Sequence, residues 1–324
     1  MKREKSLFAK KVIGLKKARS LKARTAWFRA LRPHFVITSI LPAILGAVIA
    51  LAHGHSFQWL YFMLVTAGVS FNHFALHLVD DVLDYRQAVN LKRGDEKNFF
   101  TGGSGVLPEG LLSEKHMLRA AGFLFALTAV IGVYLAWVCG WPILMLGVFG
   151  VTSSIFYTTP PIRYSYRGYG ELGLILNFGP IIVLGAYFVQ AGSFSWEPFI
   201  ASLVLGLMMW SMILINEIPD YETDRQGGKW NLVARFGKKT GAFLCVAGLF
   251  LAYGILLISA YSGMMPPFVL LGLLSLPLAV KSTLIMLRHL DDPLKMTPAN
   301  LAMIKVHALT GTSMIASYFL DIHF

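Results

Sequence analysis

Residues 241–262 read GAFLCVAGLFLAYGILLISAYS, a stretch of 22 residues without a charged side chain. An α-helix needs about 20 apolar residues to cross the roughly 30 Å hydrocarbon core of a bilayer. This stretch therefore predicts a transmembrane helix. Eight further apolar runs of similar length occupy residues 33–53, 57–79, 117–138, 141–159, 171–191, 198–217, 266–287 and 300–320. We expect an all-α integral membrane protein with nine transmembrane helices.

The composition agrees with a membrane protein and excludes other broad classes. Of the 324 residues, 56% are hydrophobic and only 14% are charged, although the formal net charge is +12. Disordered and nucleic-acid-binding proteins combine far more charge with less apolar surface. We therefore expect a lipid bilayer and no nucleic acid as a partner.

The positive charges predict how the chain is oriented. All 29 Lys and Arg residues lie in the N-terminal segment or at the connections after the second, fourth, sixth and eighth predicted helices. Because these residues collect on the cytoplasmic side of membranes, we expect a cytoplasmic N-terminus. Residues 1–32 hold twelve of them against Glu4 alone. This segment is predicted to be a basic interfacial arm, with an organelle transit peptide as the alternative, and 33–324 the transmembrane domain.

Acidic residues form a tight cluster at the end of the second predicted helix. Asp80, Asp81 and Asp84 are three or four positions apart, so on a helix their carboxylates lie close together. Like charges this close repel each other unless a cation neutralises them. Oxygen ligands without His or Cys favour magnesium over zinc.

A second acidic cluster follows the sixth predicted helix. Asn216, Asp220 and Asp224 repeat at four-residue spacing beside Glu217 and Glu222. Four predicted helices separate the two clusters, which places both at the same membrane face. The expected bundle is thus two parallel four-helix halves plus one helix. A diphosphate is the simplest ligand for two such faces loaded with Mg²⁺.

These motifs resemble those of a known family. Residues 80–84 read DDVLD, and residues 216–229 read NEIPDYETDRQGGK. Together they are similar to the two aspartate motifs of the UbiA superfamily, intramembrane prenyltransferases that attach a polyprenyl chain to an aromatic acceptor. Residues 101–110, TGGSGVLPEG, and the Arg32-Pro33 pair look most like the menaquinone branch. That branch has 1,4-dihydroxy-2-naphthoate as its acceptor. This chain departs from it by carrying Asp80 in place of Asn and Asn90 near a later Asp.

The resemblance implies a role for each candidate residue. The catalytic magnesium ligands expected are Asp81, Asp84, Asp220 and Asp224, with Asp80 and Asn216 completing the metal shells. The residues expected to bind the diphosphate are Lys229, Arg163, Arg167 and Arg225. Tyr157, His77 and Asn72 are expected near the acceptor or the allylic cation, and residues 98–110 are predicted to cover the site.

The expected activity is Mg²⁺-dependent transfer of a polyprenyl group to 1,4-dihydroxy-2-naphthoate, in menaquinone biosynthesis. The active site would face the cytoplasm from the inner (cytoplasmic) cell membrane. Other acceptors remain open as alternatives: 4-hydroxybenzoate, homogentisate, a haem or chlorophyll ring, or a glycerol phosphate ether. A cation-coupled membrane transporter is the alternative from another class, and it predicts acids at mid-membrane on broken helices.

Overall fold

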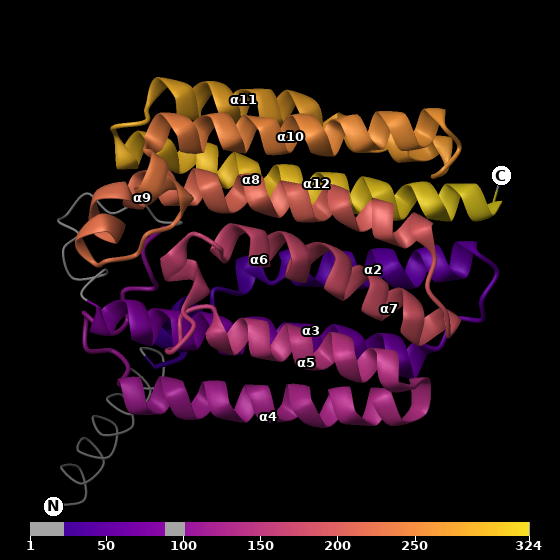
Figure 1. Cartoon of the computed structure of the whole chain (residues 1–324), viewed down its shortest axis with the longest axis horizontal. Coiled ribbons are helices and arrows are strands. Elements are labelled where there is room, and N and C mark those ends of the chain that lie inside the picture. Colours follow the sequence, from indigo (N-terminus) through magenta and orange to yellow (C-terminus); the bar gives the residue numbers. More distant parts are fainter. Residues whose placement is uncertain (1–22, 88–100, 324) are drawn as a thin grey trace, which may run out of the picture.

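The computed structural model describes residues 23–87 and 101–323, which form helices joined by turns, with no strand among them. Most of the predicted basic arm, together with Asn90, lies outside the described residues. Figure 1 shows the long helices side by side in one bundle. The all-α prediction is confirmed for the part of the chain that is described.

Helical elements cover each of the nine apolar runs, and the short elements η2 (Tyr164–Arg167) and α9 (Leu232–Phe236) lie between runs. The α-helices are α2 (Ile37–Ala52), α3 (Trp59–Arg86), α4 (Glu114–Cys139), α5 (Trp141–Phe156), α6 (Gly170–Leu176), α7 (Ile182–Ala191), α8 (Trp196–Gln226), α9 (Leu232–Phe236), α10 (Lys238–Tyr261), α11 (Leu276–Arg288) and α12 (Pro293–His323). Three short 3₁₀ segments are η1 (Pro33–Phe35), η2 (Tyr164–Arg167) and η4 (Pro267–Ser275), and η3 (Asn177–Ile181) is a π-helical turn. The run 171–191 is therefore broken into α6, η3 and α7, and the run 266–287 into η4 and α11.

Six of the described helices are long and apolar enough to cross a membrane. The number rises to seven if α2 forms one span with the helical segment Ala23–Phe35, which meets it at 44°. A further apolar helix, α5, has 16 residues and is shorter than a full crossing. The chain is thus a multi-pass membrane protein.

The bundle has two sides with a middle layer between them. In Figure 1, α8, α10, α11 and α12 lie on one side, α3, α4 and α5 on the other, and α2 with α6 and α7 between them. The most extensive packing joins α8 to α10, α3 to α4, and α2 to α7. At Gly46 on α2, a Cβ atom would lie 2.2 Å from the Val183 carbonyl oxygen of α7. Glycine is therefore required for these two backbones to meet.

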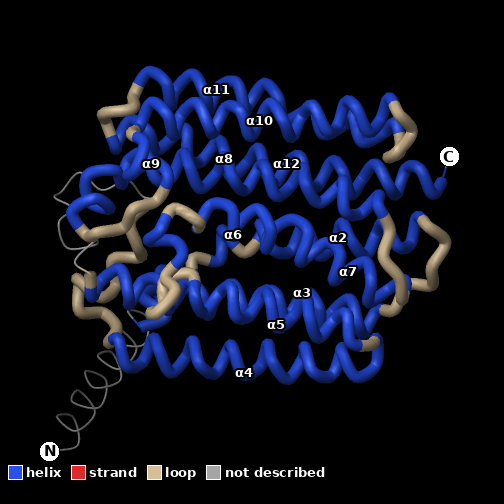
Figure 2. The backbone as a smooth tube through the Cα atoms, viewed as in Figure 1, coloured by secondary structure: helices blue, strands red, loops and turns tan. Residues whose placement is uncertain are grey.

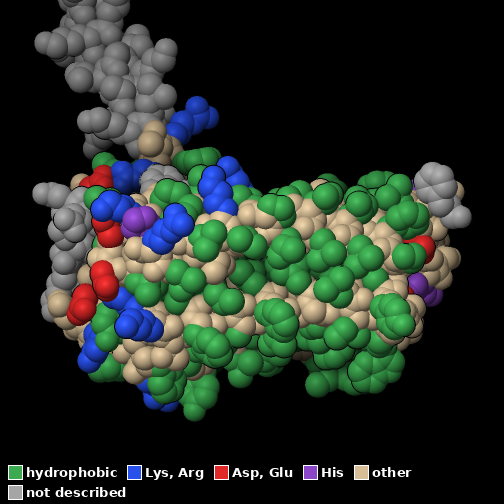
Figure 3. Space-filling model, turned by 90° about the horizontal axis from the view of Figure 1, so that it is seen from above, with side chains coloured by type: hydrophobic (Ala, Val, Ile, Leu, Met, Phe, Trp, Pro, Cys, Tyr) green, Lys and Arg blue, Asp and Glu red, His purple; other side chains and the backbone are tan. Residues whose placement is uncertain are grey.

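Both acidic clusters are carried on helices that continue beyond the predicted apolar runs. Helix α3 extends to Arg86 and α8 to Gln226, so the carboxylates are held on regular helical turns. The final turns of both helices lie at the end of the bundle that also bears α9 (Figures 1 and 2). On the face seen in Figure 3, charged side chains gather at this end, while hydrophobic side chains cover the length of the bundle. We call this the polar end.

Candidate active site

The two acidic clusters line one pocket of about 150 Å³ at the polar end. Helix α3 contributes two carboxylates and α8 contributes three. These five acids are Asp80, Asp84, Glu217, Asp220 and Asp224. Asn216 lines the same pocket, as do Thr101, Gly102 and Gly103 from the loop before α4. We call this space the acidic pocket.

Asp84 is held by two donors from other segments. The Tyr166 hydroxyl donates to Oδ1 at 2.6 Å, and the Lys229 ammonium donates to Oδ2 at 2.9 Å. Burial alone would lower the pKa of Lys229, but the negative charges of Asp84, Asp80 and Asp224 outweigh it and raise that pKa well above its usual value. Lys229 is therefore a partly buried cation. Burial also raises the pKa of Tyr166, which keeps its hydroxyl a neutral donor.

The loop that carries Lys229 is fixed at several points. The Lys229 backbone N–H donates to the Asp224 carbonyl oxygen at 2.8 Å. The Asn231 side-chain amide donates to the Asp224 carboxylate at 2.7 Å. The N–H of Leu232 donates to Glu171 Oε1 at 2.5 Å. Glu171, fully buried at the start of α6, thus anchors the segment after α8. Our sequence analysis missed Glu171. Its signal was available, because it is the only acid in the apolar run 171–191 and an acid there is costly unless satisfied.

Asp81 lies differently from its predicted place. It is not among the residues that line the acidic pocket. The Arg32 guanidinium donates to its Oδ1 at 2.5 Å, as does the Ser104 N–H at 2.9 Å, and the Ser104 hydroxyl donates to Oδ2. Asp80 does line the pocket, and its Oδ1 is buried without a hydrogen-bond partner among the described residues. The carboxylate face of α3 that lines the acidic pocket is therefore Asp80 with Asp84.

Asn216 is in the acidic pocket but already has a partner. The Asn300 amide of α12 donates to Asn216 Oδ1 at 2.7 Å and to the Ile215 carbonyl oxygen at 3.0 Å. A carbonyl oxygen has two lone pairs, so Asn216 keeps one acceptor position for a metal ion. The contact also joins α12 to α8.

Of the four cations predicted to bind a diphosphate, only Lys229 lines the acidic pocket. The Arg163 guanidinium lies 4.1 Å from the centroid of the Tyr166 ring. Arg167 donates to the Pro161 carbonyl oxygen at 2.8 Å, and Arg225 donates to the Tyr221 hydroxyl. The second cation of the pocket lining is Arg32, which sequence analysis used only as part of a family signature.

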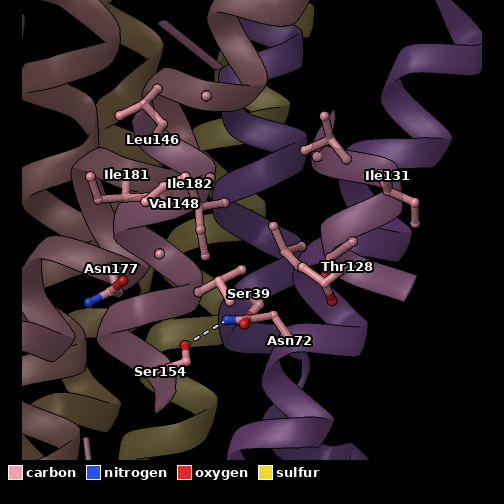
Figure 4. A pocket seen from close by; sticks show the side chains of 18 of the residues that line it. Ser39, Asn72, Thr128, Ile131, Leu146, Val148, Ser154, Asn177, Ile181 and Ile182 are labelled. Carbon is pink, nitrogen blue, oxygen red and sulfur yellow. Dashed lines mark hydrogen bonds between the residues drawn. The ribbon is translucent and has the colours of Figure 1, made fainter. Parts of the chain in front are cut away.

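An apolar cavity of about 320 Å³ adjoins the acidic pocket. It lies among α3, α4, α5 and the α6–η3–α7 segment, and we call it the apolar cavity (Figure 4). The two spaces share five lining residues, which are His73, Leu76, Tyr157, Leu174 and Phe178. A ligand with a charged head and an apolar tail could therefore occupy both at once.

The residues predicted near an acceptor or cation surround this junction. Asn72 lines the apolar cavity and donates to the Ser154 hydroxyl at 2.7 Å (Figure 4). Tyr157 lines both spaces and is buried. His77 lines the acidic pocket, and its Nε2 lies 2.8 Å from Nε2 of His73. The structure thus brings these three predicted residues to the two connected spaces.

The oxygen-rich lining fits a divalent cation whose remaining coordination positions are filled by a bound ligand. Among the described residues, no group of three or more His, Cys, Asp or Glu side chains is close enough to hold a metal ion by itself. Mg²⁺ commonly binds one or two carboxylates and takes its other oxygens from water and phosphate groups. The buried, unpartnered Asp80 Oδ1 offers such an oxygen. The geometry therefore suits Mg²⁺ shared between the chain and an anionic substrate.

Comparison with known proteins identifies the family. The UbiA prenyltransferase family matches residues 39–304. The 2-carboxy-1,4-naphthoquinone phytyltransferase of Synechocystis is 24% identical over 91% of this chain and 93% of its own length. The 1,4-dihydroxy-2-naphthoate octaprenyltransferase of Escherichia coli is 26% identical over 91% of this chain and 96% of its own length. The solved structure of a UbiA homologue from Archaeoglobus fulgidus bound to GPP and Mg²⁺ has a TM-score of 0.67 at 14% identity, covering 92% of this chain and all of the homologue. The chain belongs to the UbiA prenyltransferase family.

Proposed function

We propose that this prenyltransferase uses Mg²⁺ to transfer a polyprenyl group from an allylic diphosphate to 1,4-dihydroxy-2-naphthoate, a step of menaquinone biosynthesis. The observation that carries the proposal is the junction of the acidic pocket with the apolar cavity at Tyr157. A prenyl diphosphate has the same two halves, one highly charged and one apolar. The relatives named for naphthoquinone and dihydroxynaphthoate acceptors support the choice of acceptor.

The charge of the acidic pocket supports a requirement for metal ions. Five carboxylates face only two cations, Arg32 and Lys229, so the lining alone would repel a diphosphate. The residues we propose to hold Mg²⁺ are Asp84, Asp220 and Asp224, with Asp80 and Asn216. Mg²⁺ bound there would neutralise the diphosphate and stabilise it as a leaving group.

The chain's own residues then have separate tasks at the reacting end. Lys229, fixed by Asp84 and by its loop, places a cation beside the diphosphate. The ring of Tyr157 lies at the junction, where its face can stabilise an allylic cation. Thr101, Gly102 and Gly103 cover the pocket and help to exclude water, which would otherwise capture the cation. His77 and Asn72 are proposed to contact the acceptor.

The apolar cavity is proposed to hold the prenyl chain. Helices α3, α4 and α5 supply most of its wall, including the glycines Gly68, Gly132, Gly147 and Gly150. Glycine at these positions leaves room that larger side chains would fill. At Gly132 and Gly147, an added Cβ would meet no atom within 4 Å. The width of the cavity therefore depends on small residues along three neighbouring helices.

We further propose nine membrane crossings, with the N-terminus and the polar end in the cytoplasm of a cell with an inner membrane. The distribution of Lys and Arg supports this orientation. In this arrangement residues 1–32 form the interfacial arm and 33–324 the transmembrane domain. A cysteine-accessibility scan of the connections at both ends of the bundle tests the orientation. Labelling of the connection near Ser262 from the cytoplasmic side would contradict it.

The decisive experiment is transfer by the purified protein. We expect labelled geranylgeranyl diphosphate to be joined to 1,4-dihydroxy-2-naphthoate with loss of the carboxylate as CO₂, only when Mg²⁺ is present. Parallel reactions contain 4-hydroxybenzoate or homogentisate, and a chelator serves as the metal control. Product with 4-hydroxybenzoate alone would overturn the naphthoate assignment. The absence of any prenylated product from the whole acceptor panel would overturn the transfer itself.

A further inference from the structure

Arg32 has a strained backbone. It is one of two non-glycine residues with positive φ in the described part of the chain, with φ 47° and ψ 57°. Residues other than glycine rarely adopt this left-handed backbone conformation. A residue that precedes proline, as Arg32 precedes Pro33, is normally extended. Such strain persists only where the surroundings impose it, and it gathers at functional sites.

The surroundings that impose it are Asp81 and the loop before α4. Asp81, 3% exposed, accepts from Arg32 at 2.5 Å and from both the N–H and the hydroxyl of Ser104. One turn earlier, Arg29 donates to the Ser104 carbonyl oxygen at 3.0 Å and pairs with Glu109. The segment that ends at Arg32 and the loop around Ser104 are thus fastened to α3 through one buried carboxylate.

This arrangement leaves most of the Arg32 guanidinium available. The side chain lines the acidic pocket, and its hydrogen bond to Asp81 uses Nη2. A guanidinium has five N–H groups in a planar fork that matches phosphate oxygens. Arg32 and Lys229 are the two cations of the described pocket lining, and each is held by a carboxylate of α3.

We propose that Arg32 binds the diphosphate of the prenyl donor, and that Asp81 is the residue that positions Arg32 instead of a magnesium ligand. The inference rests on the proposed function, because it requires a diphosphate in the acidic pocket. The proposal gives Asp81 and Asp84, two carboxylates of the same motif, different roles. Asp84 lines the acidic pocket and takes part in metal binding there, whereas Asp81 lies outside the pocket lining and accepts from Arg32 and Ser104.

Binding of a non-hydrolysable donor tests the assignment without turnover. Calorimetric titration of the full-length protein with geranylgeranyl thiolodiphosphate, at several Mg²⁺ concentrations, gives the affinity and the Mg²⁺ midpoint. A charge-assisted hydrogen bond is worth a factor of about ten or more, so we expect Arg32→Gln to weaken binding by at least that factor. Arg32→Lys should recover only part of it, since an ammonium lacks the fork. The control Arg86→Gln removes an exposed arginine paired with Glu114 at the same end and should bind like the wild type.

The Mg²⁺ midpoint distinguishes the two aspartates. Asp81→Asn should weaken binding several-fold at an unchanged midpoint, and should add nothing in a protein that already carries Arg32→Gln. Asp84→Asn should raise the midpoint. Ser104→Ala, which removes one donor to Asp81, provides a milder variant if Asp81→Asn does not fold, as checked by thermal unfolding.

Two results would overturn this inference: wild-type affinity in Arg32→Gln, or a midpoint raised in Asp81→Asn as much as in Asp84→Asn. Failure of the proposed function looks different, because then the wild-type protein itself does not bind the analogue at any Mg²⁺ concentration.

Discussion

Replacing Gly132 with leucine tests whether the apolar cavity holds the prenyl chain. Gly132 lies on α4 and lines the cavity, and an added Cβ meets no atom within 4 Å. Leucine adds four carbon atoms to a cavity of about 320 Å³. The variant should fold, because exchange of glycine for leucine within a helix is favourable by up to about 1 kcal/mol. The added side chain should instead compete with the distal part of a long donor.

The size of the effect follows from the apolar surface that is lost. An isoprene unit has five carbons, so excluding one from the cavity costs up to about 4 kcal/mol at roughly 0.8 kcal/mol per buried CH₂. At about 1.4 kcal/mol per factor of ten, this is up to roughly a thousandfold in kcat/KM. Donors short enough to end before Gly132 should keep their kcat/KM. The preference of the enzyme should therefore shift toward shorter chains.

The assay measures kcat/KM for dimethylallyl, geranyl, farnesyl and geranylgeranyl diphosphate with one acceptor. Gly122→Leu is the matched control, because Gly122 lies on the same helix, its Cβ would also meet nothing within 4 Å, and it does not line the cavity. An equal loss for every donor in Gly132→Leu would refute the reasoning. A length-dependent loss in Gly122→Leu would refute it too.

Three further substitutions have defined outcomes. Asp84→Asn leaves the Lys229 ammonium without its carboxylate partner. We expect a loss of about 3–5 kcal/mol in the free energy of unfolding, measured with denaturant, together with loss of transfer. Gly46→Ala places a Cβ atom 2.2 Å from the Val183 carbonyl oxygen and should destabilise the protein by at least about 1–3 kcal/mol; an unchanged unfolding temperature would contradict the close approach of α2 and α7. Glu197→Gln weakens the hydrogen bonds of Glu197 with His53 and Tyr318 at the end of the bundle opposite the site. It should lower the unfolding temperature by an amount worth about 1–3 kcal/mol while kcat/KM stays unchanged, and a large loss of transfer would show that the two ends are coupled.

The positions of the helices could be predicted from the sequence because each depends on a local property, the length of an apolar run. Breaks inside these runs could not. The π-helical turn that begins at Asn177 arises where its amide donates to Ser153 of α5 and to the Gly173 carbonyl oxygen, and Pro180 follows within the same turn. The contact with Ser153 is tertiary, and hydropathy registers neither an amide hydrogen bond to the preceding turn nor the missing N–H of a proline. Hydropathy therefore gives one span where the structure has three consecutive elements.

The site was predictable in part for the same reason. Four-residue spacing places Asp80 and Asp84 on one face, and the structure turns that face into the acidic pocket. Three-residue spacing pairs Asp81 with Asp84 equally well, and only the rotation of α3 against its neighbours decides between the two faces. Arg32 and Glu171 act through partners distant in sequence, so no local pattern indicates their contacts.

The acidic pocket lies at the polar end of the bundle, so the orientation of the bundle in the membrane decides which aqueous compartment the pocket faces. A diphosphate carries charge that a hydrocarbon layer excludes, so it can reach the acidic pocket only from the aqueous compartment that this end faces. A molecule inserted in the opposite orientation would have the same fold and the same contacts. Its prenyl donor, however, would be in the compartment on the other side of the membrane from the acidic pocket. Under the proposed function, the direction of insertion during biosynthesis would therefore determine whether the protein is active, independently of how well it folds.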